Sequence, residues 1–231
     1  MYNYETGEIL CMVSSPSYDP LDPPEDLETN PAYDGAYLNR FLSGTFVPGS
    51  VFKTVTLTAA IENIPDLFSR QWTCTGSTDV GGEAITCPYA HGTMDIYGAL
   101  SSSCNGVFGL LANELGADTL ARYAGKAGLT SSYEVSGIKT AAGRFDVSGA
   151  SANQLGWAGI GQYTDAVNPC ALMVYMGAIA NGGRAAIPRL IYKTVIPMGE
   201  GGLSLGPGLT GQTDTLIQSD TAARLADMMA R

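Results

Sequence analysis

The sequence is poor in histidine and lacks a long apolar run. Its only histidine is His91, and nowhere do 18 or more apolar residues follow one another. A single imidazole excludes a zinc site built on histidines and leaves a Ser-His-Asp triad with one candidate base. Without a long apolar run, no membrane-spanning helix is expected. A secretory signal is not expected either, because the first 15 residues have neither a basic nor an apolar segment.

Positive charge is also scarce. The 231 residues include 12 Lys and Arg against 22 Asp and Glu, which gives a net charge of −10. A surface this acidic repels phosphate groups, so nucleic acid and anionic membrane surfaces are excluded as partners. Charged residues make up only 15% of the chain and hydrophobic residues 45%, which is typical of a globular protein with a real core.

The N-terminal residues predict a hairpin, with a turn at Glu5–Gly7 and a strand over residues 8–15. Because the domain begins inside this hairpin, the chain is expected to be a piece of a longer protein. Loops or irregular stretches are expected at residues 16–39, 131–150 and 198–212, and a strand at 185–197. Apolar periodicity predicts helices at residues 50–63, 94–100, 105–116, 117–125, 169–183 and 219–231.

Two of the five cysteines, Cys74 and Cys87, bracket a turn-rich insert with Gly81 and Gly82 near its centre. This arrangement favours a cross-strand disulfide, which would add roughly 3 kcal/mol and implies an oxidising compartment. Two ordinary buried thiols are the alternative. Zinc is not expected, because two cysteines with only His91 nearby lack a fourth ligand. The sequence predicts neither a metal nor a cofactor.

The segment "FVPGSVFKTVTLTAAIE" places Ser50 and Lys53 on one face of the first turn of a helix. A serine at a helix N-terminus lies among free backbone N–H groups, which stabilise a developing oxyanion. A lysine with a lowered pKa can remove the serine's proton. Alone, the pair also fits a capping serine followed by a solvent-facing lysine.

A second polar group, Ser103-Cys104-Asn105, interrupts a helical stretch downstream. On a loop, Ser103 and Asn105 can point into the same cleft, where Ser103 could relay a proton and Asn105 could bind a substrate amide. A polar helix break with a cap is the alternative. The combination with Ser50 and Lys53 favours the catalytic interpretation.

Together these segments resemble the transpeptidase domain of penicillin-binding proteins, in particular the class B type. The resemblance covers nearly all of residues 1–231 as one domain and is carried by residues 6–20, 37–56, 91–116 and 159–183. It implies an α+β fold like that of the serine β-lactamases, with an antiparallel sheet flanked by helices. The nucleophile would lie at a helix start between the sheet and the helical region.

The resemblance also implies roles for four residues. Ser50 would be the acylated nucleophile, Lys53 its base, Ser103 the proton relay and Asn105 a ligand of the substrate amide. The reaction implied is acylation by a D-Ala-D-Ala stem peptide with loss of the last D-Ala, then transfer to an amine of a neighbouring strand. Penicillins would acylate the same serine. Cell-wall synthesis proteins would be partners, at the extracytoplasmic face of the bacterial membrane.

The sequence departs from the family pattern at three places. Val51 and Asn168-Pro169 stand where threonine and Thr-Pro are commoner. The third motif, Lys-Thr-Gly, occurs nowhere, and the segments Ile138–Gly143 and Tyr192–Val195 match neither its sequence nor its position. In the family this motif follows a helix such as residues 219–231. The domain is therefore expected to end before the third motif, and the fragment alone to be inactive.

Two alternatives remain open. One is a serine β-lactamase or a penicillin-sensing receptor domain, which shares the first two motifs. The loop at residues 157–169 has no glutamate to activate a deacylating water, and Gln162 is not a base, which favours the transpeptidase. The other alternative is a non-catalytic scaffold domain that keeps the fold without the third motif.

Overall fold

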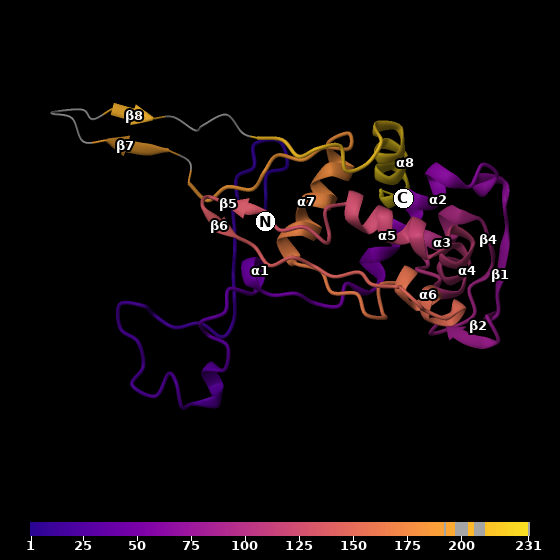
Figure 1. The fold of residues 1–231 in the computed structure, drawn as a ribbon, viewed down its shortest axis with the longest axis horizontal. Coiled ribbons are helices and arrows are strands. Elements are labelled where there is room, and N and C mark those ends of the chain that lie inside the picture. Colours follow the sequence, from indigo (N-terminus) through magenta and orange to yellow (C-terminus); the bar gives the residue numbers. More distant parts are fainter. Residues whose placement is uncertain (192, 197–202, 206–210, 231) are drawn as a thin grey trace.

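The computed structural model describes residues 1–191, 193–196, 203–205 and 211–230. Figure 1 shows a helical body with a long N-terminal loop region on one side and the β7–β8 hairpin extending away from it. The elements in chain order are η1 (Pro31–Tyr33), α1 (Arg40–Ser43), η2 (Gly49–Phe52), α2 (Lys53–Asn63), η3 (Leu67–Ser69), β1 (Trp72–Cys74), β2 (Ser77–Val80), β3 (Glu83–Thr86), β4 (Gly92–Met94), α3 (Ile96–Ser101), α4 (Asn105–Leu115), α5 (Ala117–Lys126), β5 (Glu134–Val135), β6 (Ile138–Lys139), α6 (Ala152–Gly159), α7 (Pro169–Ala180), β7 (Thr194–Ile196), β8 (Leu203–Leu205) and α8 (Ser219–Met229).

Helix α2 is the centre of the core. Its residues 53–60 are all buried, and it packs against α4, α5 and α8. Burial on every side explains why its sequence has no clear polar face. Its threonines satisfy their hydroxyls internally: Thr56 donates to the carbonyl of Gly159, and Thr58 lies 2.8 Å from the Tyr175 hydroxyl of α7. The helix therefore provides a rigid base for the residues at its N-terminus.

The predicted helices are confirmed, and their ends have local causes. Gly116 has a φ of 79° and separates α4 from α5. Asn168 caps α7 through the backbone N–H groups of Cys170 and Ala171. The Asn168 amide also donates to the carbonyls of Leu42 and Gly44. These bonds need an amide N–H₂ group, which accounts for asparagine in place of the commoner threonine.

The strands form four separate two-stranded antiparallel sheets in the described part of the chain, and not the one larger sheet that was expected. The predicted N-terminal hairpin is present as a single bridge between Tyr2 and Ile9. The expected strand over residues 8–15 is reduced to bridges, among them Glu8 with Arg189. Since every strand pair is antiparallel and lies among helices in the chain order, the α+β class is confirmed.

Two further differences concern residues for which no helix or strand was expected. Helix α6 was not predicted, although Ser151 and Gln154 form a capping box at its start. Within the expected loop at 198–212, residues 203–205 form β8, which pairs with β7. The rest of that loop, except residues 211 and 212, lies outside the described residues, as does Tyr192. No helix in the described ranges is long and apolar enough to cross a membrane.

The insert between Cys74 and Cys87 differs from the expected cross-strand pair. Strand β1 pairs with β4, which places Cys74 opposite Gly92, while β2 pairs with β3. Cys87 follows β3 and therefore has no cross-strand position opposite Cys74. All five cysteines are free thiols, so the structure does not contain the Cys74–Cys87 disulfide.

Candidate active site

Ser50 and Lys53 lie at the junction between η2 and α2. Ser50 is exposed within the 3₁₀ turn, whereas Lys53, the first residue of α2, is only 1% exposed. The turn is fixed by Gly49, which has a φ of 59° and donates its N–H to the carbonyl of Gly161. Local geometry thus presents the serine to solvent and points the lysine inward.

The Lys53 ammonium is surrounded by four oxygen atoms. Its Nζ lies 2.7 Å from the Ser103 carbonyl oxygen and 2.7 Å from Oδ1 of Asn105. The two serine hydroxyls follow, with Oγ of Ser103 at 2.8 Å and Oγ of Ser50 at 3.2 Å. The structure therefore brings together all four residues that the sequence singled out. It also adds Phe108, whose ring lies 5.7 Å from Nζ.

This arrangement determines what the lysine can do with protons. The carbonyl and the amide oxygen can only accept, so they occupy two N–H bonds of the amine. The third position on Nζ then faces the two hydroxyls. In the protonated lysine this position holds a donor, and in the neutral lysine it holds a lone pair that can accept a proton from Ser50 or Ser103.

Because Lys53 is buried, its uncharged form is populated at a lower pH than that of an exposed lysine. Desolvation lowers the pKa of Lys53 from its ordinary 10.5 to about 8, against an opposing contribution from the nearby Cys87 and Cys104. The four oxygen contacts belong to neutral groups, so none of these contacts provides a carboxylate to offset the burial. A lysine of this kind can act as a base near neutral pH.

Ser103 lies in the turn before α4, and Asn105 is the first residue of that helix. Ser103 has a φ of 52°, a left-handed conformation that is uncommon for serine and typical of constrained functional positions. Asn105 donates through Nδ2 to the carbonyl of Thr86, at 2.8 Å, while its Oδ1 accepts from Lys53. These contacts use one of the two Nδ2 hydrogens and leave the other for a substrate carbonyl. The carbonyl of Thr86 is a site component that the sequence did not indicate.

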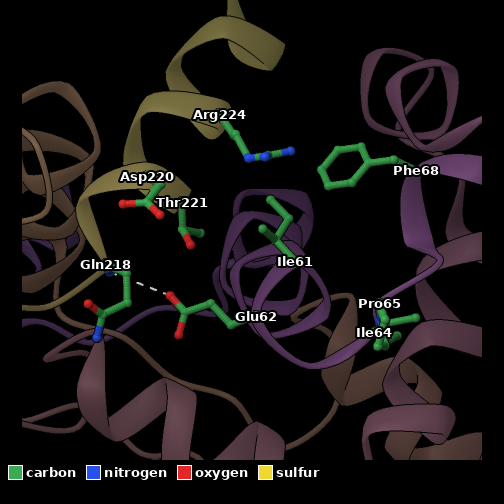
Figure 2. Close-up of a pocket in the computed structure, with 9 residues that line it drawn as sticks. All are labelled: Ile61, Glu62, Ile64, Pro65, Phe68, Gln218, Asp220, Thr221 and Arg224. Atoms are coloured by element: carbon green, nitrogen blue, oxygen red, sulfur yellow. Dashed lines mark hydrogen bonds between the residues drawn. The ribbon is translucent and has the colours of Figure 1, made fainter.

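A hollow of about 510 Å³ adjoins Ser50. Apolar side chains from α7 and α8 line one side of it, including Met176, Met228 and Met229. Figure 2 shows a different hollow of about 520 Å³, between the C-terminal end of α2 and α8, with Glu62 and Arg224 on its walls. Glu62 follows Lys53 by nine residues, about 14 Å along the helix. The hollow in Figure 2 is therefore not the reaction site.

An exposed serine beside a buried lysine, with a second serine bonded to the same amine, defines a class of proteins that form acyl-serine intermediates. Sequence comparison gives the family: residues 1–231 match the penicillin binding protein transpeptidase domain. The chain belongs to this family, as its resemblance predicted.

The curated relatives include peptidoglycan D,D-transpeptidase PbpA of Mycobacterium tuberculosis. It is 30% identical over 249 residues, which cover 97% of this chain and 48% of PbpA. Stage V sporulation protein D of Bacillus subtilis is 34% identical over 126 residues, or 52% of this chain and 18% of that protein. The chain spans about half the length of PbpA.

Solved structures agree with this assignment. Penicillin-binding protein A from M. tuberculosis, in its acyl-enzyme complex with ceftriaxone, matches with a TM-score of 0.85 and 29% identity, over 97% of this chain and 53% of that one. The D,D-transpeptidase domain of a peptidoglycan glycosyltransferase from Eggerthella lenta matches with a TM-score of 0.82 over 97% of this chain and 58% of that one. Its 24% identity supports the fold alone.

Proposed function

We propose that the protein is a peptidoglycan D,D-transpeptidase that acts through an acyl-enzyme on Ser50. The observation that carries the proposal is the contact between the buried Nζ of Lys53 and Oγ of Ser50, at 3.2 Å. A buried amine with a lowered pKa, placed against an exposed hydroxyl, is what a serine nucleophile needs.

In the proposed reaction, neutral Lys53 takes the proton of Ser50 as the serine oxygen attacks the carbonyl carbon of the penultimate D-Ala. The backbone N–H of Ser50, at a helix start, supports the oxyanion of the tetrahedral intermediate. Ser103, bonded to the same amine, passes the proton to the leaving D-Ala nitrogen. An amine of a second strand then attacks the ester, and Ser50 regains its proton.

Asn105 would bind the substrate backbone with its remaining Nδ2 hydrogen, since its other polar atoms are bonded to Lys53 and Thr86. Penicillins would acylate the same serine, because their ring carbonyl takes the place of the peptide carbonyl. The substrate is peptidoglycan, so the protein would work at the extracytoplasmic face of the membrane with other cell-wall synthesis proteins.

The test is release of D-Ala from a peptide that ends in D-Ala-D-Ala, with and without an amine acceptor, measured on the whole protein. The proposal expects release that depends on Ser50 and a cross-linked product when the amine is present. The Ser50→Ala variant should release none, while Ser69→Ala, at an exposed serine of η3 outside the hollow beside Ser50, should retain the activity. Absence of release from the folded whole protein would favour the scaffold alternative.

A β-lactamase or a penicillin sensor remains the second candidate to separate. The lifetime of the penicillin adduct on Ser50 discriminates the β-lactamase, and the release and transfer assay discriminates the penicillin sensor. A transpeptidase should hold the adduct for hours, whereas rapid hydrolysis would contradict the proposal and identify a β-lactamase.

A further inference from the structure

Three cysteines and the single histidine lie together beside the second motif. One ligand atom from each of Cys74, Cys87, His91 and Cys104 lies within 4.8 Å of all the others. They come from separate places in the chain: the end of β1, the residue after β3, the residue before β4 and the N-cap of α4. The packing of β1 against both β4 and α4 brings these places to one end of the molecule (Figure 1).

The distance between the sulfur atoms fits a shared metal ion. The Sγ atoms of Cys87 and Cys104 are 3.8 Å apart. Two sulfurs in a tetrahedral site with Zn–S bonds of about 2.3 Å are also separated by about 3.8 Å. A disulfide would need the same atoms at about 2.05 Å. The geometry thus favours coordination by a common ion over a covalent pair.

Burial provides a second, independent observation. Cys104 is fully buried and Cys74 is 2% exposed. Nδ1 of His91 is also buried, and it has no hydrogen-bond partner among the described residues. An unpaired buried nitrogen is costly, and native structures usually satisfy such atoms. A metal bound by the imidazole would explain its place beside three thiols.

We propose that Cys74, Cys87, His91 and Cys104 bind one Zn²⁺ in a closed structural site. Three sulfurs and one imidazole nitrogen are ligands that favour zinc over magnesium or calcium. Four protein ligands leave no open position, so the ion has a structural and not a catalytic role. On binding, the three thiols release three protons, and the resulting Zn²⁺ thiolate group has a net charge of −1.

The site would stabilise the second motif. Cys104 stands between Ser103 and Asn105, and Cys87 directly follows Thr86, whose carbonyl accepts the Asn105 amide. An ion bound to both cysteines would hold this turn in place against Lys53. The sequence argument against zinc counted two cysteines and one histidine. It missed Cys104, the fourth ligand, because only the fold brings the N-cap of α4 to the insert.

Metal content tests the proposal directly. The whole protein, purified without chelators and under reducing conditions, should contain about one zinc per chain by plasma mass spectrometry. The Cys87→Ser and His91→Ala variants should lose at least about 90% of that zinc, since each removes a ligand from a half-buried position. Cys170→Ser, at a buried cysteine of α7 outside the cluster, is the matched control and should retain its zinc.

Two further measurements cover the case of a variant that fails to fold. Cobalt added to the metal-free wild type should produce thiolate-to-metal charge-transfer absorption, which zinc then abolishes. Alkylation of a second preparation, purified without reductant and denatured with a chelator, should modify all five cysteines. Wild-type protein that neither contains zinc nor binds cobalt would overturn the proposal, as would a Cys74–Cys87 disulfide found by mass mapping. Neither readout depends on acylation, so the proposed function is tested separately.

Discussion

Lys53 is deeply buried and contacts only neutral oxygens among its hydrogen-bond partners. Its protonation state, and with it the proposed base function, should therefore change with pH near neutrality. Its pKa is lowered to about 8, chiefly by desolvation. Below this pH the amine is protonated and cannot accept the proton of Ser50. We therefore predict that the rate of acylation by penicillin rises with pH up to about 8 and then levels off, as measured by stopped-flow or quenched-flow mass spectrometry.

The Lys53→Arg variant tests the same point without removing the positive charge. A guanidinium stays protonated at all accessible pH values, so acylation should fall by about a thousandfold and lose its rise with pH. Lys139→Arg, at an exposed lysine of β6, serves as the control with an unchanged rate. An acylation rate in Lys53→Arg that still rises through pH 8 would show that another group is the base.

Asp165 provides a prediction about stability. It is 1% exposed, neither carboxylate oxygen has a hydrogen-bond partner among the described residues, and desolvation raises its pKa from 3.8 to about 7. Between pH 3.8 and about pH 7, the Asp165 carboxyl therefore keeps its proton in the native state, whereas in the unfolded state it has lost it. Stability should fall as pH rises through this window and reach its minimum above it.

The Asp165→Asn variant removes this titration. It should match the wild type in thermal stability near pH 4 and exceed it near pH 8, with a gain of at most about 4 kcal/mol. Asp146→Asn is the control, because hydrogen bonds from Ser148 lower the pKa of that exposed carboxyl, and its replacement should give no gain at pH 8. Equal melting temperatures for Asp165→Asn and wild type at pH 8 would contradict the account.

At this scale the sequence predicted the four residues that meet around the Lys53 amine but not their surroundings. The spacing of Ser50 and Lys53 on one helical turn is a local property, and the structure confirms that they are in contact. The Thr86 carbonyl and Cys104 enter the site only through packing of the insert against α4, which no local pattern encodes.

Helix α6, which apolar periodicity did not predict, is determined by its N-terminal cap and by its close packing on α4. Ser151 accepts from the backbone of Gln154, and the Gln154 side chain accepts from the backbone of Ser151. The helix then packs closely on α4, where Gly159 lies so near Ala112 that an added Cβ would be 2.3 Å from the alanine Cβ. The capping box was the signal available in the sequence, and the glycine contact could be recognised only in the fold.

Ser151→Ala should destabilise the protein by about 1 kcal/mol, because it leaves a helix N-terminal N–H group without its cap. The measurement is the urea midpoint of unfolding. Ser219→Ala on α8, where the hydroxyl contacts only the neighbouring exposed Asp220, should change stability by less than about 0.5 kcal/mol. An unchanged midpoint in Ser151→Ala would mean that the cap does not stabilise α6.

The strands were less predictable than the helices. Helix positions follow from local spacing, and Gly116 marks the break between α4 and α5 in sequence and structure alike. Strand pairing depends on distant partners, such as Glu8 with Arg189 and Phe46 with Val167. For the same reason the pairing of β1 with β4, which places Gly92 and not Cys87 opposite Cys74, did not follow from the sequence.

For the whole molecule, the fold and family follow from motifs spread in order along the chain, and the comparisons confirm both. Helix α2 connects the core to the site: Lys53 is its first residue, Ser50 lies in η2 directly before it, and the buried length of α2 anchors both in the core. The net charge of −10 is compatible with the proposed peptidoglycan substrate and unfavourable for binding a phosphate backbone.

The most direct test of the central claim is mass spectrometry of the whole protein after incubation with penicillin G, followed by peptide mapping. The account predicts one penicilloyl group on Ser50, stable for hours and absent from Ser50→Ala. Running the 231-residue chain in parallel tests the expectation that it is inactive alone. A folded whole protein that gains no adduct, or gains one at another residue, would contradict the assignment of Ser50 as the nucleophile.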